Sequence, residues 1–310
     1  MSDYEIRDFR TVEELRECVD LQEETWGRGF SERVSPAILK VAQILGGVAA
    51  GAYDASNDLV GFVFGMTGVR DGRVVHWSDM LAVRRGLRDA GLGRRLKEYQ
   101  RAVLLERGID TMYWTFDPLQ SRNAHLNLSH LGIVVREYEE DMYGDTDSPL
   151  HAGIGTDRFI ALWLMDSPRV ERRLAGLEGP PASIEGIPRA LEAVLDGEGW
   201  GGEAGLDDAG AGSGGASAAA GGLDAGTGGA SPGTGRPHPR PGAPRTELDA
   251  PRLAVAIPAH IEGIMRDDMD LARAWRRATR SVFTRYLPAG YEVRELVRGP
   301  RVSHYILERR

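Results

Sequence analysis

The sequence has very little cysteine and no long apolar run. Cys18 is the single cysteine among 310 residues, which excludes an internal disulfide and disfavours a secreted, disulfide-stabilised fold. No segment reaches the roughly 18 apolar residues of a membrane-spanning helix, and the polar start MSDYEIRDFR lacks the apolar stretch of a signal peptide. We therefore expect a cytoplasmic protein without a membrane partner, in which Cys18 is a small core residue rather than a nucleophile.

The signatures of two further ligand classes are missing. The formal net charge is -8, which argues against a sequence-independent, electrostatic grip on nucleic acid. No set of histidines and cysteines has the spacing of a zinc site, and His125 and His130 lie five residues apart, off a common face of an α-helix. We therefore expect neither a nucleic-acid partner nor a metal cofactor.

Glycine, by contrast, is abundant and concentrated in one place. Residues 197–235 hold sixteen of the 40 glycines, and this composition buries too little apolar surface to offset the entropy of ordering the chain. We predict four parts: a first domain at 1–166, a weakly helical connector at 167–196, a disordered Gly/Pro-rich linker at 197–247, and a second unit at 248–310. Within the connector, IPRALEAVL is expected to form a short helix. Within the linker, RPHPRPGAPR is expected to be extended.

Apolar periodicity predicts the elements of the first domain. A capping box of Thr11 and Glu14 begins one helix, and Ser35-Pro36 begins another. The later elements are an antiparallel meander of three apolar segments, a helix at about 92–106, the strand TMYWTF, a helix at about 121–130, and the strands IVVREYE and RFIALWLM. The order β-α-α-β-β-β-α-β-α-β-β indicates an α/β (α+β) fold.

The second unit is predicted to have the order β-α-β-β. Its elements are the strand RLAVAIPAHI, a basic amphipathic helix at about 269–286, and the strands YEVRELV and SHYILE. This order repeats the end of the first domain, and TRYLPAGYEVRELV faintly resembles LSHLGIVVREYE. The unit is therefore either a degenerate half-repeat that adds to the first sheet or a separate small module. The arginines of its helix are expected on a solvated face.

The stretch MLAVRRGLRDAGLGRRL predicts a site for a polyanion. After an apolar strand, the turn at 88–93 leads onto a helix, and the free backbone N–H groups of such a turn point at one spot. Gly91 and Gly93 let a phosphate approach the backbone, while the helix dipole and five arginines add positive charge. The stretch lacks the Gly-Lys-Ser/Thr of a nucleotide-binding P-loop, and Leu96 stands where a dinucleotide-binding motif has its third glycine, so both of these phosphate sites are excluded.

This stretch is similar to the acyl-CoA pyrophosphate loop of the GNAT acetyltransferase superfamily, whose pattern is Gln/Arg-x-x-Gly-x-Gly/Ala. Arg88, Gly91 and Gly93 match that pattern, Val83 stands where the preceding strand usually ends, and Leu96 matches the helix leucine. WTFDPLQSRNAHLN and YGDTDSPLHAGIGTDRF further look like a bacterial subgroup of predicted acetyltransferases with an extended C-terminal part. Some relatives in that subgroup succinylate amino acids.

The resemblance implies a GNAT-type mixed, mostly antiparallel sheet flanked by helices, in which SDMLAV and TMYWTF splay apart to admit a pantetheine arm. Acetyl-CoA, or another acyl-CoA, is the implied co-substrate. Leu81 and Val83 would pair with the arm through their backbones. The remaining cofactor contacts are assigned to Arg88, Ala90, Gly91, Leu92, Gly93, Arg94 and Asn123.

The implied reaction is transfer of an acyl group to a primary amine of a small molecule, by direct attack in a ternary complex. Asp79 is the candidate general base, since this strand often holds a carboxylate in the superfamily, and its spacing of two from Leu81 predicts the same face. His76 would point to the opposite face as a structural histidine. Leu128 takes the position of the usual tyrosine acid, which leaves the general acid open among Tyr113, Tyr138 and Tyr143.

Two loops are expected near the acceptor. Trp26 and Phe30 either wall a binding cleft or plug the core. The insertion DMYGDTDSPLHAGIGTDR either shapes the acceptor pocket or is only a surface loop. In the first case His151 and Arg158 could bind an acceptor carboxylate, and Asp145, Asp147 and Asp157 could bind an amine. A calcium-binding loop is disfavoured because no Glu stands at its closing position. Two alternatives to acetyl transfer are considered: N-succinyl transfer to amino acids, and a non-catalytic protein that binds acyl-CoA as a regulator. The sequence also leaves open whether the protein forms a homodimer.

Overall fold

The computed structural model describes residues 4–87, 91–144, 153–181, 183–195 and 237–310. The strands are β1 (Glu5–Asp8), β2 (Val48–Tyr53), β3 (Leu59–Arg70), β4 (Arg73–Val83), β5 (Thr111–Phe116), β6 (Val134–Glu139), β7 (Arg158–Leu164), β8 (Arg189–Leu191), β9 (Ala193–Val194), β10 (Arg240–Pro241), β11 (Arg252–Pro258), β12 (Tyr291–Val297) and β13 (Val302–Arg309). The helices are α1 (Val12–Trp26), α2 (Pro36–Ile44), α3 (Leu92–Glu106), α4 (Ser121–His125), the π-helix η1 (Leu126–His130), α5 (Pro168–Leu174), α6 (Ile261–Asp267) and α7 (Met269–Tyr286).

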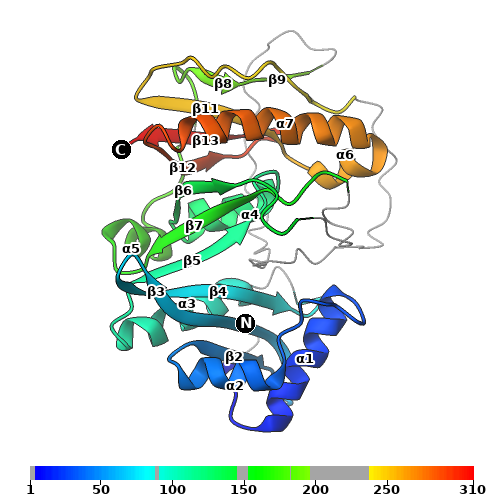
Figure 1. The fold of residues 1–310 in the computed structure, drawn as a ribbon, viewed down its shortest axis with the longest axis vertical. Coiled ribbons are helices and arrows are strands. Elements are labelled where there is room, and N and C mark those ends of the chain that lie inside the picture. The colour runs from blue at the N-terminus through cyan, green and yellow to red at the C-terminus, as the bar shows by residue number, and fades with distance from the viewer. Residues whose placement is uncertain (1–3, 88–90, 145–152, 182, 196–236) are drawn as a thin grey trace.

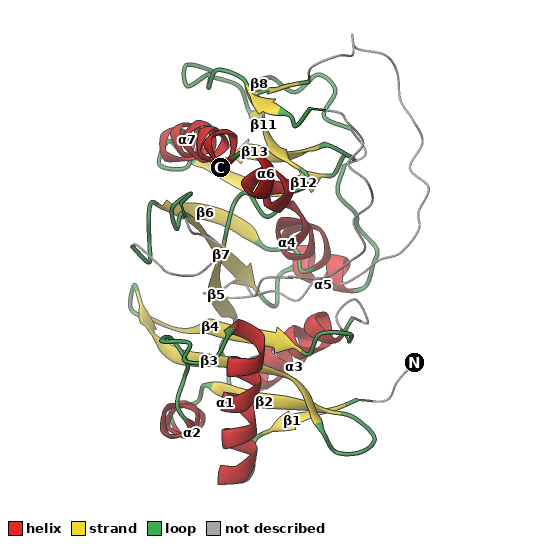
Figure 2. Cartoon of the chain, turned by 90° about the vertical axis from the view of Figure 1, so that its right-hand side faces the viewer, coloured by secondary structure: helices red, strands yellow, loops and turns green. Residues whose placement is uncertain are grey.

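Eleven of these strands form one sheet along the long axis of the molecule (Figure 1), in the order β1-β2-β3-β4-β5-β7-β6-β12-β13-β11-β8. Only β4 with β5 and β8 with β11 pair in parallel among the described residues. In Figure 2, α2 and α7 lie on one face of the sheet and α3, α4 and α5 on the other. The α/β class with a mostly antiparallel sheet flanked by helices is confirmed.

Local signals in the sequence account for the first domain. The Thr11 side chain accepts a hydrogen bond from Glu14 N while Glu14 reaches back, so the capping box starts α1 as predicted. Ser35 caps α2, with Pro36 at its first position. The predicted order of the first domain is confirmed, and Cys18 is fully buried between α1 and the sheet. Among the described residues, no helix combines the length and apolar character needed to cross a bilayer.

The prediction for the connector is wrong. IPRALEAVL forms the short strands β8 and β9 instead of a helix, while α5 lies earlier in the connector. The Ala190 and Leu191 side chains are fully buried, and β8 pairs with the apolar strand β11. Partners distant in sequence therefore override the local helix preference of Ala, Leu and Glu.

The linker prediction is wrong for its last part. Residues 196–236 lie outside the described part of the chain, but 237–247 run along the second unit and contain β10, which pairs with β9. The carbonyl of Pro239 accepts a hydrogen bond of 2.9 Å from the Trp275 indole, and the amide of Arg245 donates one of 2.8 Å to the Ala190 carbonyl. The extended Pro-rich stretch is thus anchored to the second unit.

The helix predicted at 121–130 changes type in its middle. Its second half, η1, follows π-helical geometry, in which residues five apart stack on one side. The rings of His125 and His130 accordingly lie 4.9 Å apart between centroids. The expectation that an interval of five separates them is wrong, because it assumed α-helical spacing.

The second unit, together with β8 of the connector, extends the sheet and mirrors the strand order of the first domain. Outward from the junction, β6, β7, β5 and β4 on one side match β12, β13, β11 and β8 on the other, and the outermost pair on each side is parallel. Both units carry Gly-x-x-Val-Arg-Glu, at 132–137 and 290–295, with a left-handed Gly and a register shift at the Arg. The two equivalent valines, Val135 and Val293, pair with each other across the junction.

Candidate acyl-transfer site

β4 and β5 separate in the middle of the sheet. They pair only at His76 with Met112 and at Trp77 with Tyr113. Beyond that point Leu81 pairs with Val63 of β3 on one side only. After Trp77, β4 therefore makes no further strand pairs with β5, as the splayed-strand interpretation requires.

A β-bulge in β4 sets the direction of Asp79. The register with β3 shifts so that Ser78 lies opposite Gly65 and Met80 opposite Phe64, which leaves Asp79 without an opposite residue. Ser78 and Leu81 face α3, whereas Asp79 continues the side of Trp77 and lies near Glu32 of the α1–α2 loop. The expectation that Asp79 and Leu81 share a face is wrong, because the extra residue of the bulge breaks the alternation.

The surroundings of Asp79 suit a proton acceptor. Burial raises the pKa of its carboxyl, the negative charge of Glu32 raises it further, and a hydrogen bond from the Trp77 side chain opposes both. Desolvation and a neighbouring like charge both disfavour the ionised form. A carboxylate with a raised pKa accepts a proton from an ammonium more readily than an ordinary one does.

A chain of buried polar groups supports the bulge from the α3 side. The Lys97 ammonium nitrogen lies 2.7 Å from Ser78 Oγ, Ser78 Oγ donates to Gln100 Oε1 at 2.9 Å, and Gln100 Nε2 lies 2.9 Å from His76 Nε2. Burial lowers the pKa of His76 to about 3 and that of Lys97 well below its usual range. The structural role expected for His76 is supported by these contacts. Sequence reasoning missed Lys97, although its spacing of four from Gly93 and three from Gln100 places it on the buried face of α3.

Helix α3 begins directly after a left-handed glycine. Gly91 is the N-cap of α3 in the left-handed region, with φ of 78°, and a glycine has no side chain to occupy the first-turn N–H groups. Leu92 and Gly93 are buried behind it. Arg88 and Ala90 lie outside the described residues.

Two other predicted cofactor residues are engaged with protein groups. The Arg94 guanidinium bonds to Glu98 Oε1 at 2.7 Å and to the Leu174 carbonyl at 2.5 Å. The Asn123 side-chain oxygen accepts a hydrogen bond of 3.2 Å from Asn127. The Arg94 and Asn123 side chains are therefore already hydrogen-bonded within the protein.

The three candidate acids differ in position. Tyr113 packs under the Arg70 guanidinium, 4.6 Å from ring centroid to Cζ. The Tyr138 hydroxyl donates a hydrogen bond to the Asp157 carboxylate, and burial together with the charge of that carboxylate raises the pKa of Tyr138. The Tyr143 hydroxyl lies 3.0 Å from Thr115 Oγ1 on β5, and the charge of Asp79 acts on it. The charge of Asp79 thus links Tyr143 to the candidate base.

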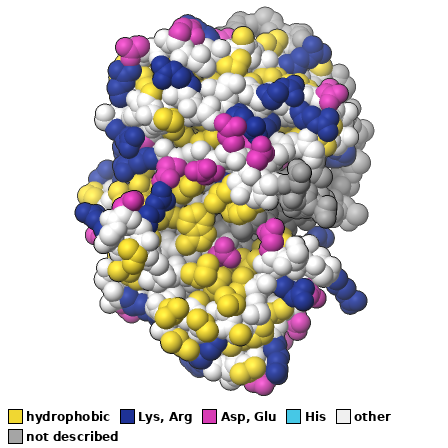
Figure 3. Space-filling model, in the orientation of Figure 1, with side chains coloured by type: hydrophobic (Ala, Val, Ile, Leu, Met, Phe, Trp, Pro, Cys, Tyr) yellow, Lys and Arg dark blue, Asp and Glu magenta, His cyan; other side chains and the backbone are white. Residues whose placement is uncertain are grey.

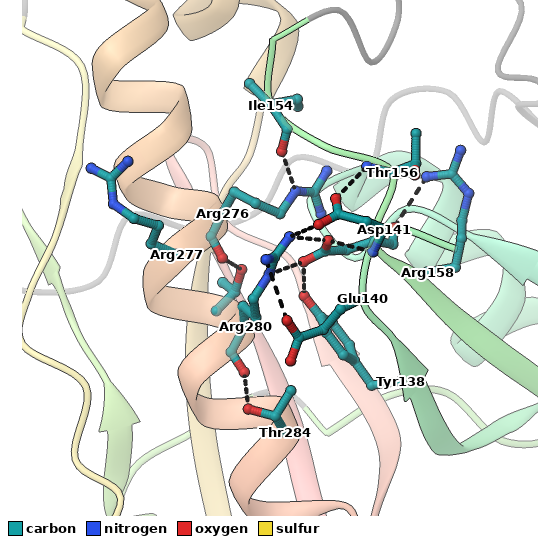
Figure 4. A network of polar contacts seen from close by, with 12 residues as sticks. Tyr138, Glu140, Asp141, Ile154, Thr156, Arg158, Arg276, Arg277, Arg280 and Thr284 are labelled. Carbon is teal, nitrogen blue, oxygen red and sulfur yellow. Dashed lines mark hydrogen bonds and ion pairs between the residues drawn. The ribbon is translucent and has the colours of Figure 1, made fainter. Parts of the chain in front are cut away.

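The insertion between β6 and β7 is tied to α7 by an ionic network (Figure 4). Arg280 contacts Asp157 at 2.5 Å, Asp141 at 3.0 Å and Glu140 at 3.3 Å. Arg276 forms two hydrogen bonds, of 2.9 and 2.6 Å, with the buried carboxylate of Asp117 after β5. The expectation of a solvated arginine face is wrong for these two arginines, because carboxylates distant in sequence pair with them.

The predicted acceptor residues do not gather at one place. Asp157 is fully buried and already ion-paired with Arg280, so its carboxylate is not available to bind an acceptor amine. Asp145, Asp147 and His151 lie outside the described residues. Arg158 is buried, and its guanidinium carbon lies 5.2 Å from the Tyr143 ring centroid. The described residues contain no group of three or more His, Cys, Asp or Glu side chains placed to hold a metal ion.

The aromatic residues of the α1–α2 loop pack onto the core. Trp26 lies 5.4 Å from Phe30 and 6.1 Å from Phe62 between ring centroids. Both side chains are partly buried against the cluster under α1 and α2. Of the two readings of this loop, packing is the one these contacts favour.

Comparison with known proteins finds similarity in structure only. No model of a protein family matches the chain, and no curated protein matches it. Similar solved structures include the ribosomal-protein-S18-alanine N-acetyltransferase of Escherichia coli, with 18% identity, a TM-score of 0.42, and 53% of this chain and 96% of that chain covered. An acetyltransferase of the GNAT family from Streptococcus pneumoniae has 17% identity and a TM-score of 0.41, covering 52% and 98%. A GNAT superfamily phosphinothricin acetyltransferase from Sinorhizobium meliloti, in complex with AcCoA, has 14% identity and a TM-score of 0.43, covering 52% and 88%.

Proposed function

We propose that the chain is an acyl-CoA-dependent N-acyltransferase that transfers an acetyl group to a primary amine of a small molecule. The observation that carries the proposal is the arrangement at β4. The strand opens from β5 beyond Trp77, and the bulge at this opening presents Asp79, whose pKa is raised. The Gly91 turn at the N-terminus of α3 offers hydrogen-bond donors for the CoA diphosphate. A thioester in the opening would meet an amine deprotonated by Asp79.

The proposed reaction is a direct attack in a ternary complex. Asp79 takes a proton from the acceptor ammonium, itself or through water, and the free nitrogen then bonds to the thioester carbonyl carbon. As the C–S bond breaks, sulfur leaves with the electron pair, and the nitrogen releases its second proton to solvent to become the neutral amide. The CoA thiolate takes a proton from Tyr143, which solvent reprotonates, or directly from solvent. Tyr143 is favoured over Tyr113 and Tyr138 because its hydroxyl lies on Thr115 of β5, near Asp79.

A non-catalytic acyl-CoA-binding regulator is the second candidate. Leu128, at the position where the resembling superfamily carries its tyrosine acid, is fully buried in the core. A regulator would bind acyl-CoA and release no thiol with any amine. N-succinyl transfer to amino acids is the donor alternative, since the residues described here do not discriminate between short acyl chains.

Asp79→Asn separates the enzyme from the regulator. We expect kcat/KM to fall roughly a hundredfold while the Kd for acetyl-CoA is unchanged, because the amide cannot accept the proton. In the unsubstituted protein, activity should decline as pH falls through the raised pKa of Asp79, so the acidic limb should lie above the ordinary carboxyl range. Thiol release against pH measures both. Asp71→Asn, which removes a carboxylate from the exposed β3–β4 turn, is the control and should leave turnover unchanged. Unchanged turnover in Asp79→Asn would refute the assignment of Asp79 as general base.

Gly91→Glu tests the cofactor site independently of turnover. The added carboxylate would lie where the diphosphate binds, and we expect the Kd for acetyl-CoA to rise at least a hundredfold. Gly72→Glu is the matched control, because Gly72 has a similar φ of 75° and an added Cβ meets nothing within 4 Å at either position. Thermal shifts with acetyl-, succinyl- and free CoA give the readout and rank the donors. Equal thermal shifts with acetyl-CoA in the Gly91→Glu and Gly72→Glu variants would show that the N-terminus of α3 is not part of the acyl-CoA site.

We also infer that residues 1–166 are the acyltransferase domain and that residues 248–310 are a degenerate copy of its second half. Support comes from the mirrored strand order and from the shared Gly-x-x-Val-Arg-Glu segments with their pairing valines. The copy has a task in the site, since Arg276 and Arg280 of α7 hold the end of β5 and the β6–β7 insertion.

A further inference from the structure

A groove crosses the face of the sheet from Trp77 of β4 to Glu139 of β6. It has a volume of about 740 Å³, within the usual range for small-molecule sites. Its floor is made by the aromatic rings of Trp77 and Tyr113 together with Val75 and Ile160, and Met66 and Met142 form its sides. Figure 3 shows hydrophobic side chains gathered over the middle of this face, with acidic side chains above them.

The groove is acidic at the end formed by β6. Four carboxylates, those of Glu137, Glu139, Glu140 and Asp141, and one guanidinium, that of Arg70, belong to its lining. Arg70 bonds to Glu137 at 2.5 Å, and Arg280 pairs with Glu140 and Asp141. Among the described residues no ion pair holds the exposed Glu139. The β6 end therefore keeps an excess of negative charge.

The opposite end of the groove is formed at Trp77 of β4, two residues before the candidate base Asp79. Trp77 belongs to the floor and also hydrogen-bonds to Asp79, and Met142 is the neighbour of Tyr143. Between the two ends lie three strand spacings, from β4 across β5 and β7 to β6, which is roughly 14 Å at about 4.8 Å per spacing. Carboxylates thus stand at both ends of an aromatic and aliphatic floor.

We infer that the acceptor is a linear aliphatic diamine or polyamine, an inference that rests on the proposed acyl transfer. One ammonium lies at Asp79 and becomes the nucleophile, and the methylene chain lies along Trp77 and Ile160, beside Tyr113 and the Arg70 guanidinium that covers its ring. A second ammonium meets Glu139 and the Glu137 carboxylate, which it shares with Arg70. Aromatic faces attract cations as well as alkyl chains, so the same floor favours a charged acceptor over a neutral one.

The test compares 1,8-diaminooctane with octylamine, which differ only in the distal ammonium. We expect the diamine to have a Kd by calorimetry and a KM at least tenfold lower, with the difference shrinking at high salt. Glu137→Gln combined with Glu139→Gln should raise the diamine Kd and KM about tenfold, while leaving those of octylamine and the KM of acetyl-CoA unchanged. Glu13→Gln with Glu17→Gln, on the exposed face of α1, removes the same charge away from the groove.

The outcomes separate this inference from the proposed function. Diamine binding that depends on Glu137 and Glu139 but yields no thiol release would support the groove and overturn acyl transfer. Acyl transfer with equal constants for diamine and octylamine, or a diamine Kd that the double variant does not change, would overturn the groove and leave the enzyme standing.

Discussion

Arg276→Met is expected to lower the free energy of unfolding by about 3 to 5 kcal/mol, the range seen when one partner of a buried ion pair is removed. The side chains of Arg276 and Asp117 are 3% and 4% exposed, so the variant would remove a guanidinium that makes two hydrogen bonds to a buried carboxylate. The Arg276 Nε–H donates in addition to the Ile154 carbonyl at 3.2 Å. Chemical denaturation followed by circular dichroism measures the loss.

Two variants make this expectation specific. Arg277→Met removes a charge from the next, exposed position of α7 and should change stability by less than about 0.5 kcal/mol. Adding Asp117→Asn to Arg276→Met removes the buried negative charge while keeping an acceptor for the Leu119 amide, which Asp117 holds at 2.8 Å, and should recover part of the loss. If Arg276→Met and Arg277→Met were equally mild, the pair would not hold the two units together.

Gly65→Ala is expected to cost about 3 kcal/mol of stability, the upper part of the range for overpacked cores, and to abolish most turnover. Gly65 lies opposite the bulge of β4. A Cβ there would lie 2.5 Å from the Trp77 carbonyl oxygen, 3.0 Å from Gln100 Nε2 and still closer to His76 Nε2. The strand or its buried polar chain must shift, and Asp79 is the next residue but one after Trp77.

The same strand provides the control for that substitution. Gly68→Ala places its Cβ in open space, with nothing within 4 Å, and should leave stability near that of the unsubstituted chain. The comparison uses denaturation for stability and thiol release for activity at a temperature where both variants are folded. Normal turnover in folded Gly65→Ala would mean that the bulge does not position Asp79.

Much of the first domain could be predicted because its signals are local. The Thr11 capping box, the Ser35-Pro36 start and the alternating apolar segments each act within a few residues, so the elements appear where their patterns lie. The Gly91 turn belongs to the same group, since a left-handed glycine before a helix is a local requirement.

The remainder depends on partners that are distant in sequence. The bulge at Asp79 arises from the register with β3, so counting alternate residues along β4 could not place its side chain. The charge of Arg276 suggested exposure, but its partner Asp117 lies 159 residues away. Nor could composition identify the groove, because its floor and its carboxylates come from separate strands that only the sheet order brings together.

The junction between β6 and β12 determines how the sheet behaves on dilution. If its two sides belonged to separate chains, they would come apart as the protein became scarce. Here one polypeptide carries both, so the strands meet at an effective concentration set by their tether rather than by the amount of protein present. The strand edge that could recruit another chain is occupied from within, and a single molecule holds its own continuous sheet.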